Sequence, residues 1–281
     1  MNIFNDMKFF APTPPSLADL TDLKTRKVIT EERISLMSED TLIVIPARVG
    51  STRLPGKMLA DINGDPLIVR TYKSVVAANV GPVIVACDGQ EIVDVIKAAG
   101  GEAIITDPAL PSGTDRVYAA YKKYDTEKKF KYIINVQGDL PFVDSRFISS
   151  CAELMRTERY DMTTPAAPIT DESYKVNSVV KIAVAHVSET EGKALYFSRS
   201  PIPFGGPYYH HVGLYCFRVN ALEKFMSLPQ SSLEKIEKLE QLRALENGMT
   251  IGIRILPDIE SPISVDTAED LERARKFGKS H

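Results

Sequence analysis

The segment 42-LIVIPARVGSTRLPGK-57 joins a short apolar run to a loop that carries two arginines and a lysine. The run 42–47 is apolar almost throughout, which is typical of a parallel strand covered on both faces. The prolines and glycines after it do not suit a helix, and glycines let backbone N–H groups approach an anion. Because Arg48, Arg53 and Lys57 add positive charge, this loop predicts a binding site for a polyphosphate at the end of a buried strand.

From Thr41 onward, apolar runs of strand length alternate with segments of helical period. The expected strands of the first half are 42–47, 82–87 and 132–136, and the expected helices are 66–79, 90–101 and 114–124. This alternation predicts a parallel sheet with helices on both faces, and such sheets bind ligands beyond the carboxyl ends of their strands. The opening loop lies at that edge.

The second half of the chain has a different pattern. We expect strands at 178–187 and 211–219, a helix over 233–248 that ends at Gly248, an apolar run at 251–256 and a last helix from Thr267. The sequence therefore predicts one α/β domain over residues 41–281 with a mixed, mostly parallel sheet. An insertion at about residues 178–248 is expected to carry a second, smaller layer.

Residues 1–40 differ from the rest of the chain. The stretch 11-APTPPSLADL-20 is rich in proline, and the residues after it are polar without a sustained period. This composition predicts a flexible N-terminal tail. Met37 stands just before the expected domain and is an alternative start of the natural protein, a hypothesis that an intact-mass measurement would test.

Composition argues against two broad classes of protein. The 34 basic and 37 acidic residues give a net charge of −3, which disfavours nucleic acid as a general partner. No window approaches the roughly 18 consecutive apolar residues of a membrane span, and no basic start followed by an apolar block opens the chain. We therefore expect a cytoplasmic protein that does not insert into a membrane.

The three cysteines, Cys87, Cys151 and Cys216, form no CxxC pair and have no histidine nearby at metal-ligand spacing. Cys87 ends an apolar strand pattern, and the other two lie in amphipathic stretches. We expect all three to be reduced and buried, with a catalytic thiol as the alternative.

The basic loop differs from the two common phosphate-binding motifs. Five residues separate Gly50 from Gly56, where the ATPase pattern has four, and Met58 stands where that pattern has a magnesium-binding Ser or Thr. No GxGxxG follows the first strand, so the dinucleotide fingerprint is also missing. A solvated surface loop with incidental arginines is the alternative interpretation.

A bound triphosphate would call for carboxylates near the loop. It carries about four negative charges near neutral pH, more than three cations neutralise, so a divalent ion is expected beside it. Asp139, in 135-NVQGDLP-141, stands at the carboxyl end of the third strand, and Asp266 lies in 264-SVDTAEDL-271. Both are candidate Mg²⁺ ligands.

Each aspartate also has a purely structural alternative. Asp139 could stabilise a Gly-Asp turn. Asp266 could cap the last helix, with Glu269 completing a capping box. Thr267 and Asp270 make an equally good box, however, and that arrangement would leave Asp266 free to point elsewhere.

Eight segments between residues 42 and 277 together resemble the 3-deoxy-manno-octulosonate cytidylyltransferases, also called CMP-Kdo synthetases. In order, they are 45-IPARVGSTRLPGK-57, 61-DINGDPLI-68, 111-PSGTDR-116, 135-NVQGD-139, 194-ALYFSRSPIP-203, 210-HHVGLY-215, 233-LEKIEKLEQLRALE-246 and 265-VDTAEDLERAR-275. Eight ordered matches are more specific than any single motif. Sialic acid cytidylyltransferases share the arginine-rich loop but lack the LEQLR helix.

The resemblance implies a Rossmann-like nucleotide-diphospho-sugar transferase fold. It implies a reaction in which CTP and Kdo give CMP-Kdo and pyrophosphate, for lipopolysaccharide biosynthesis, and a homodimer formed through the second-half insertion. A sialic-type acid or an amino-substituted octulosonate is the alternative acceptor. A non-catalytic nucleotide-binding module is a further alternative, but it would be expected to lack Asp139, Asp266 or Lys57.

The same resemblance implies roles for individual residues. The positions that match the nucleotide site are Ala47, Arg48, Ser51, Arg53, Lys57, Ser112, Gly113 and Thr114. Asp139 and Asp266 match the magnesium ligands, and with Lys57 and Arg53 they are the expected catalytic residues. The positions associated with the sugar acid are Gln137, Arg199, His211, Glu240 and Gln241.

Glu240 can also be considered from the pattern alone. In the helix expected from Leu233, it follows Ile236 by four residues and so lies on the apolar face. A carboxylate there needs a partner. Arg243, three residues on, offers a local ion pair, and the alternative is that Glu240 accepts hydrogen bonds from sugar hydroxyls.

Arg199 and His211 are less specific signals. Arg199 lies between 195-LYFS-198 and 201-PIP-203, where a rigid turn would aim it, and a guanidinium binds a carboxylate through two parallel hydrogen bonds. For Arg199, the alternative is a surface arginine. For His211, the alternative is a histidine that is merely packed or exposed beside a strand.

Overall fold

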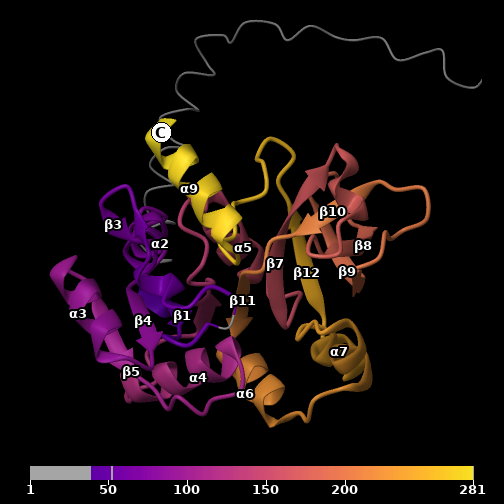
Figure 1. Cartoon of the computed structure of the whole chain (residues 1–281). Coiled ribbons are helices and arrows are strands. Elements are labelled where there is room, and N and C mark those ends of the chain that lie inside the picture. The colour runs from indigo at the N-terminus through magenta and orange to yellow at the C-terminus, as the bar shows by residue number, and fades with distance from the viewer. Residues whose placement is uncertain (1–38, 52, 281) are drawn as a thin grey trace, which may run out of the picture. The chain divides into compact units, whose positions relative to one another are not determined.

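The computed structural model describes residues 39–51 and 53–280 (Figure 1). The expected tail, residues 1–40, lies outside the described residues except for Glu39 and Asp40. Met37, the alternative start, lies outside them as well.

A ten-stranded sheet runs through the described residues in the order β10-β8-β9-β12-β7-β11-β6-β1-β4-β5. The strands are β1 (Thr41–Ala47), β4 (Val83–Cys87), β5 (Glu102–Ile105), β6 (Tyr132–Asn135), β7 (Met162–Ile169), β8 (Lys181–His186), β9 (Glu191–Ser198), β10 (Tyr208–His211), β11 (Tyr215–Arg218) and β12 (Ile251–Ile255). The predicted α/β class with a mixed sheet is confirmed. The sheet is not mostly parallel, however, because antiparallel pairings outnumber the parallel ones once β8 to β11 have joined it.

The order of the first strands explains where a site forms. From β1 through α2 (Leu67–Val76) to β4, and through α3 (Gln90–Ala98) to β5, strands are added in one direction. Helix α4 (Gly113–Tyr124) then leads back across the sheet to β6, on the other side of β1. Right-handed crossovers therefore place α4 on the opposite face from α2 and α3. The loop after β1, which leads to α2, and the loop that leads into α4 therefore leave the sheet on opposite faces at this switch point, where open α/β sheets bind ligands.

The remaining helices pack on the sheet, on one another or on a short hairpin that forms a separate two-stranded sheet. Helix α5 (Ser145–Met155) packs against β7, β11 and β12, and α6 (Val219–Ser227) packs against β6, β11 and α4. The other elements are α7 (Ser232–Glu237), α8 (Leu242–Glu246), α9 (Ala268–Ser280), the 3-10 turns η1 (Lys57–Leu59) and η2 (Glu172–Lys175), and the hairpin β2 (Asp61–Ile62) and β3 (Asp65–Pro66). Within the described ranges, no helix combines the length and the apolar character needed to cross a bilayer.

The core lies between the sheet and these helices. Every residue of β1 is buried, as expected for a strand covered on both faces. Cys87, Cys151 and Cys216 are buried and unpaired, in agreement with the prediction. Burial raises the pKa of Cys87 to about 11, and it also raises the pKa values of the other two thiols. Thiolate chemistry is therefore disfavoured at all three.

The run 211–219 was expected to be one strand, but it forms two. His211, at the end of β10, pairs with Ala166, and Cys216 in β11 pairs with Thr163 of the same strand. From His211 to Cys216 the chain advances five positions while β7 advances three, and the extra residues form a bend at Gly213. With this bend, β10 pairs with β8 while β11 pairs with β6.

The helix expected over 233–248 is interrupted, so this prediction was wrong. Helix α7 ends at Glu237, Lys238 adopts a left-handed conformation with φ 55°, and α8 begins only at Leu242. The Arg199 guanidinium donates hydrogen bonds to the carbonyls of Glu237 (2.9 Å) and Lys238 (3.4 Å). These bonds satisfy carbonyl groups that a helix end leaves free, so the break is stabilised from another part of the chain.

Candidate active site

A cleft of about 300 Å³ opens between the loop after β1 and the start of α4, and the loop after β6 also lines it. Ten of the predicted site residues line it: Ala47, Arg48, Ser51, Arg53, Lys57, Ser112, Gly113, Gln137, Asp139 and Asp266. Five others, Thr114, Arg199, His211, Glu240 and Gln241, lie outside this lining. The structure thus brings the predicted nucleotide and metal residues together from four distant parts of the chain.

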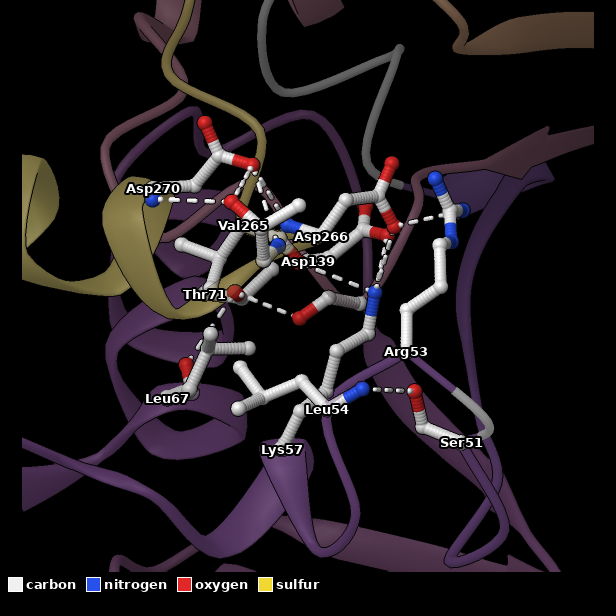
Figure 2. A network of polar contacts seen from close by, with 12 residues as sticks. Ser51, Arg53, Leu54, Lys57, Leu67, Thr71, Asp139, Val265, Asp266 and Asp270 are labelled. Carbon is white, nitrogen blue, oxygen red and sulfur yellow. Dashed lines mark hydrogen bonds and ion pairs between the residues drawn. The ribbon is translucent and has the colours of Figure 1, made fainter.

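Lys57 joins the two predicted metal ligands (Figure 2). Its Nζ donates to Asp139 Oδ2 at 2.9 Å, to Asp266 Oδ1 at 3.0 Å and to the Val265 carbonyl at 2.9 Å. Burial by itself would lower the pKa of Lys57, but the two carboxylates outweigh it and raise the pKa above the ordinary value. Lys57 is therefore a fixed ammonium at this site.

Asp139 is positioned by main-chain contacts on both sides. Its carbonyl accepts a hydrogen bond from Val265 N at 3.0 Å, which aligns it with the segment that carries Asp266. Before it, a Cβ on Gly138 would lie 2.8 Å from the Pro46 carbonyl oxygen, so only glycine lets this loop approach the end of β1. Thr71, on α2 (Figure 2), is fully buried. Its hydroxyl donates a hydrogen bond to the Gly138 carbonyl at 2.9 Å.

Asp266 does not cap the last helix. Thr267 and Asp270 form the box instead: Asp270 N donates to Thr267 Oγ1 at 3.2 Å, and Thr267 N donates to Asp270 Oδ2 at 3.0 Å. Asp270 Oδ2 also accepts from Asp266 N at 3.2 Å. The Asp266 side chain is thereby left to accept hydrogen bonds from Lys57 and from Arg53, whose NH2 lies 3.0 Å away.

The basic loop is anchored by two residues that were not predicted as site residues. Asp88, after β4, accepts a hydrogen bond from Val49 N at 2.8 Å, and Arg116 donates to its other oxygen at 3.1 Å. Arg116 is 3% exposed and lines the cleft from α4. The sequence signal for Arg116 was a cation in the expected helix 114–124, in a segment rich in alanine and tyrosine. Such an arginine is buried on the apolar side of the helix and needs a carboxylate partner, which here is Asp88.

Glu240 reaches the turn at the start of α4. Its carboxylate accepts hydrogen bonds from Ser112 Oγ at 3.0 Å and Thr114 Oγ1 at 2.8 Å. Burial raises the pKa of Glu240, and these hydroxyl contacts oppose the shift. Arg243 pairs bidentately with Glu234, at 2.9 and 2.6 Å, and its closest approach to Glu240 is 3.9 Å. The expected apolar face does not exist, because Ile236 is 75% exposed.

Gln241 and His211 form a buried chain of polar contacts. Tyr215 Oη donates to Gln241 Oε1 at 3.1 Å, Gln241 Nε2 lies 3.4 Å from His211 Nδ1, and His211 Nε2 lies 3.1 Å from Thr164 Oγ1. Burial lowers the pKa of His211 to about 3, so its ring is neutral at ordinary pH. His211 is a packed residue in this structure.

Arg199 lies outside the cleft lining and donates to the main chain. Besides the two carbonyls at the end of α7, its NH1 donates to the Asn177 carbonyl at 3.1 Å. Its own carbonyl accepts from the buried Lys181 ammonium, and its N–H donates to a Glu237 carboxylate oxygen at 3.1 Å. The role of Arg199 in binding a carboxylate stays a prediction.

The two aspartates suit a magnesium ion that arrives with a nucleotide. No group of three or more His, Cys, Asp or Glu side chains that could hold a metal occurs among residues 39–51 and 53–280. Mg²⁺, however, is commonly bound by one or two carboxylates together with substrate phosphates and water. Both carboxylates already contact one cation, the Lys57 ammonium, which shows that they converge closely enough to share a charge.

Comparisons with known proteins agree with this geometry. Residues 42–251 match the family model described as Cytidylyltransferase. A 3-deoxy-manno-octulosonate cytidylyltransferase of Paramagnetospirillum magneticum is 49% identical over 242 residues, which cover 85% of this chain and 98% of the relative. A relative of the same name from Rickettsia prowazekii is 48% identical over 245 residues, which cover 87% and 97%.

A solved structure is similar as well. It is described as CMP:2-keto-3-deoxy-manno-octonic acid synthetase complexed with CTP, and it aligns with a TM-score of 0.78 at 35% identity. The alignment covers 86% of this chain and 99% of that one.

Proposed function

The chain belongs to the cytidylyltransferase family, and we propose that it transfers CMP from CTP to the anomeric hydroxyl of 3-deoxy-D-manno-octulosonate (Kdo), with release of pyrophosphate. The single observation that carries the proposal is the convergence of Lys57, Asp139 and Asp266 in a cleft at the switch point of the sheet. The names of relatives close to half identical over most of the chain support the choice of Kdo. In finer detail, the fold is a Rossmann-like nucleotide-diphospho-sugar transferase.

The nucleotide occupies the side of the cleft formed by the β1 loop and the start of α4. Arg48, Arg53 and Lys57 supply positive charge for the triphosphate, the Ser51 hydroxyl adds a donor, and the Ala47 backbone lies near the nucleoside. The turn Ser112-Gly113-Thr114 holds the nucleoside.

The sugar acid binds beyond Gln137, on the side where Glu240 and Gln241 approach. Glu240 accepts hydrogen bonds from sugar hydroxyls while it remains tied to the α4 turn. His211 and Arg199 complete this side, His211 through its contact with Gln241 and Arg199 through the end of α7.

Asp139 and Asp266 are the residues that hold magnesium. When bound, the ion lowers the pKa of the attacking hydroxyl and relieves negative charge at the phosphates. The protein itself aligns the anomeric hydroxyl with the α-phosphorus and the leaving pyrophosphate, because phosphoryl-group chemistry depends on in-line placement. Arg53 and Lys57 stabilise the charge that develops on the pyrophosphate.

Pyrophosphate release tests this function. The purified full chain is incubated with CTP and Kdo, with and without Mg²⁺, and compared with UTP and with a sialic acid or an amino-substituted octulosonate as acceptor. We expect release with CTP, Kdo and Mg²⁺ together. Faster release with a different sugar acid would move the proposal to that acceptor, and no release with any pair would refute it.

Several wider properties follow from the same assignment. We propose that residues 41–281 act as one domain, that residues 178–248 carry the sugar site and a dimer contact, and that the active form is a homodimer. The product would serve lipopolysaccharide biosynthesis, and a cytoplasmic location follows because CTP is a cytoplasmic metabolite.

A further inference from the structure

The hydrogen-bond capacity of Lys57 is fully used by the protein itself. An ammonium has three N–H donors. In the structure, all three have protein acceptors: Asp139 Oδ2, Asp266 Oδ1 and the Val265 carbonyl. Lys57 therefore cannot bind a phosphate without giving up one of these contacts.

The two aspartates, in turn, depend on this ammonium. Because both contacts end on Nζ, their oxygens are separated by no more than the sum of 2.9 Å and 3.0 Å. Two carboxylates held so close repel one another unless a cation lies between them. Arg53 also contacts Asp266, but its side chain is 67% exposed and the contact is screened by solvent. The side chain of Lys57 is only 10% exposed.

The Lys57 backbone also keeps the ammonium at this place. Gly56, with φ 68°, turns the loop into η1, and Lys57 N donates to the Leu54 carbonyl at 3.1 Å. The residue thus starts a hydrogen-bonded turn, and its side chain reaches from that turn to both aspartates.

We propose that Lys57 is a built-in counter-ion, which holds the Asp139–Asp266 pair together before nucleotide binds and is exchanged for a divalent cation only when nucleotide phosphates take over the ammonium. This inference rests on the proposed function. It makes the metal a companion of the nucleotide instead of a resident of the free protein. A divalent ion and an ammonium against the same two oxygens repel one another, so the free protein binds such an ion weakly.

Nucleotide-free metal binding tests the exchange directly. Mn²⁺ is titrated into the metal-free full chain, and free Mn²⁺ is measured by electron paramagnetic resonance. The variant Lys57→Met removes the ammonium and keeps most of the side-chain volume. The control is Lys73→Met, which changes net charge equally but removes an exposed lysine paired with Asp65 at 2.9 Å. We expect Lys57→Met to bind Mn²⁺ at least about tenfold more tightly than the wild type, and Lys73→Met to equal the wild type.

Thermal unfolding gives a second readout. In a chelator, Lys57→Met is expected to unfold at a lower temperature than the wild type, and added Mg²⁺ is expected to raise its midpoint more than that of the wild type. If Lys57→Met does not yield folded protein, Lys57→Gln, which keeps two neutral donors, replaces it in both measurements. Equal or weaker Mn²⁺ binding by the variant, or tight binding by the nucleotide-free wild type, would overturn the proposal.

Neither measurement uses CTP, Kdo or turnover. Tighter Mn²⁺ binding by the variant, combined with no pyrophosphate release by the wild type, would leave the exchange standing and refute the function. The reverse pair of results would refute the exchange alone.

Discussion

The parallel half of the sheet, β6-β1-β4-β5, and the antiparallel part, β10-β8-β9, contribute to the site in different ways. In the parallel half, side chains from the loops after β1 and β6 enter the cleft directly. In the antiparallel part, the polar residues contact one another or the main chain, as His211 and Arg199 do. The topology of the parallel strands brings the first group to one edge of the sheet, where long-range bonds such as Lys57–Asp139 join it. The polar residues of the second group are instead bonded within the protein away from the cleft.

The two parts also differ in how their charged side chains are exposed and bonded. At the cleft, Lys57, Asp139 and Asp266 keep partly exposed oxygens and an ammonium that a ligand can recruit. In the antiparallel part, Lys181 is fully buried and donates to the carbonyls of Val176, Val179 and Arg199. Charge that a ligand can recruit is therefore concentrated at the cleft, whereas the Lys181 ammonium is already bonded to main-chain carbonyls.

The largest expected effect concerns the cleft. Asp139→Asn and Asp266→Asn each keep the side-chain shape but remove a charge, and we expect a loss of about a hundredfold or more in kcat. Pyrophosphate release measures it, and circular dichroism checks that the fold is kept. The matched control is Asp65→Asn, an acid paired with Lys73 away from the cleft, with activity near the wild type. Near-normal synthesis by either cleft variant would contradict the metal-ligand assignment.

Acid should lower the free energy of unfolding through two histidines of the antiparallel part. Burial lowers the pKa of His210 to about 4 and that of His211 to about 3, both below the ordinary value of 6.5. Between pH 6.5 and pH 4, the unfolded chain therefore binds more protons at these histidines than the folded protein does. Their contribution to stability is complete above about pH 6.5 and is lost as the pH falls toward 4. From pH 7 to pH 5.5 we expect the free energy of unfolding to fall by about 2 kcal/mol for the pair.

Urea denaturation at the two pH values measures this fall. In His210→Gln, the fall in the free energy of unfolding between pH 7 and pH 5.5 should be smaller than in the wild type. In His186→Gln, which changes an exposed histidine, the fall should equal that of the wild type. An unchanged difference in His210→Gln would show that the ring titrates normally in the folded protein.

Glu240 lies where the two regions meet, and its substitution separates their roles. Glu240→Gln is expected to raise the KM for Kdo about tenfold and to change the KM for CTP by less than about twofold. Initial rates at varied concentrations of each substrate give both values. Glu223→Gln, on an exposed ion pair with Lys122, serves as the control. An equal rise in the KM for CTP would assign Glu240 to the nucleotide instead.

The smallest effect is expected at Thr71, behind the cleft. Thr71→Val keeps the volume but removes the hydroxyl that bonds the Gly138 carbonyl, at a cost of about 1–2 kcal/mol in the free energy of unfolding. Because that carbonyl precedes Asp139, we also expect the Mg²⁺ concentration for half-maximal rate to rise about threefold. Thr71→Ser should restore both quantities. A variant with lower stability but an unchanged Mg²⁺ requirement would limit Thr71 to a structural role.

The sequence predicted three of the four strands of the parallel half, β1, β4 and β6, because their apolar runs are local, but it missed the short edge strand β5. An apolar run marks β1 and the turn residues mark its end, whereas the switch of direction at β6 was not predicted and comes from the strand pairing. The Thr267–Asp270 box is also local, and the structure confirms it as one of the two alternatives. Strand 132–136 needed no distant contact to be recognised.

The antiparallel part could not be predicted in the same way. The break at Lys238 depends on Arg199, which lies 39 residues earlier and donates to carbonyls that a periodic pattern assigns to a continuous helix. Strand β9 was not recognised, and the bend between His211 and Tyr215 depends on how both strands pair with β7. Each of these features is set by tertiary contacts, which overrule local periodicity.

The ammonium of Lys57 bonds Asp139 across 82 positions and Asp266 across 209 positions of sequence. During synthesis on the ribosome, the acidic pair can assemble only after the segment that follows β12 has emerged and docked beside the first loop. Turnover would then report on completion of the whole sheet, so an activity assay on nascent or refolding chains would serve as a late marker of folding.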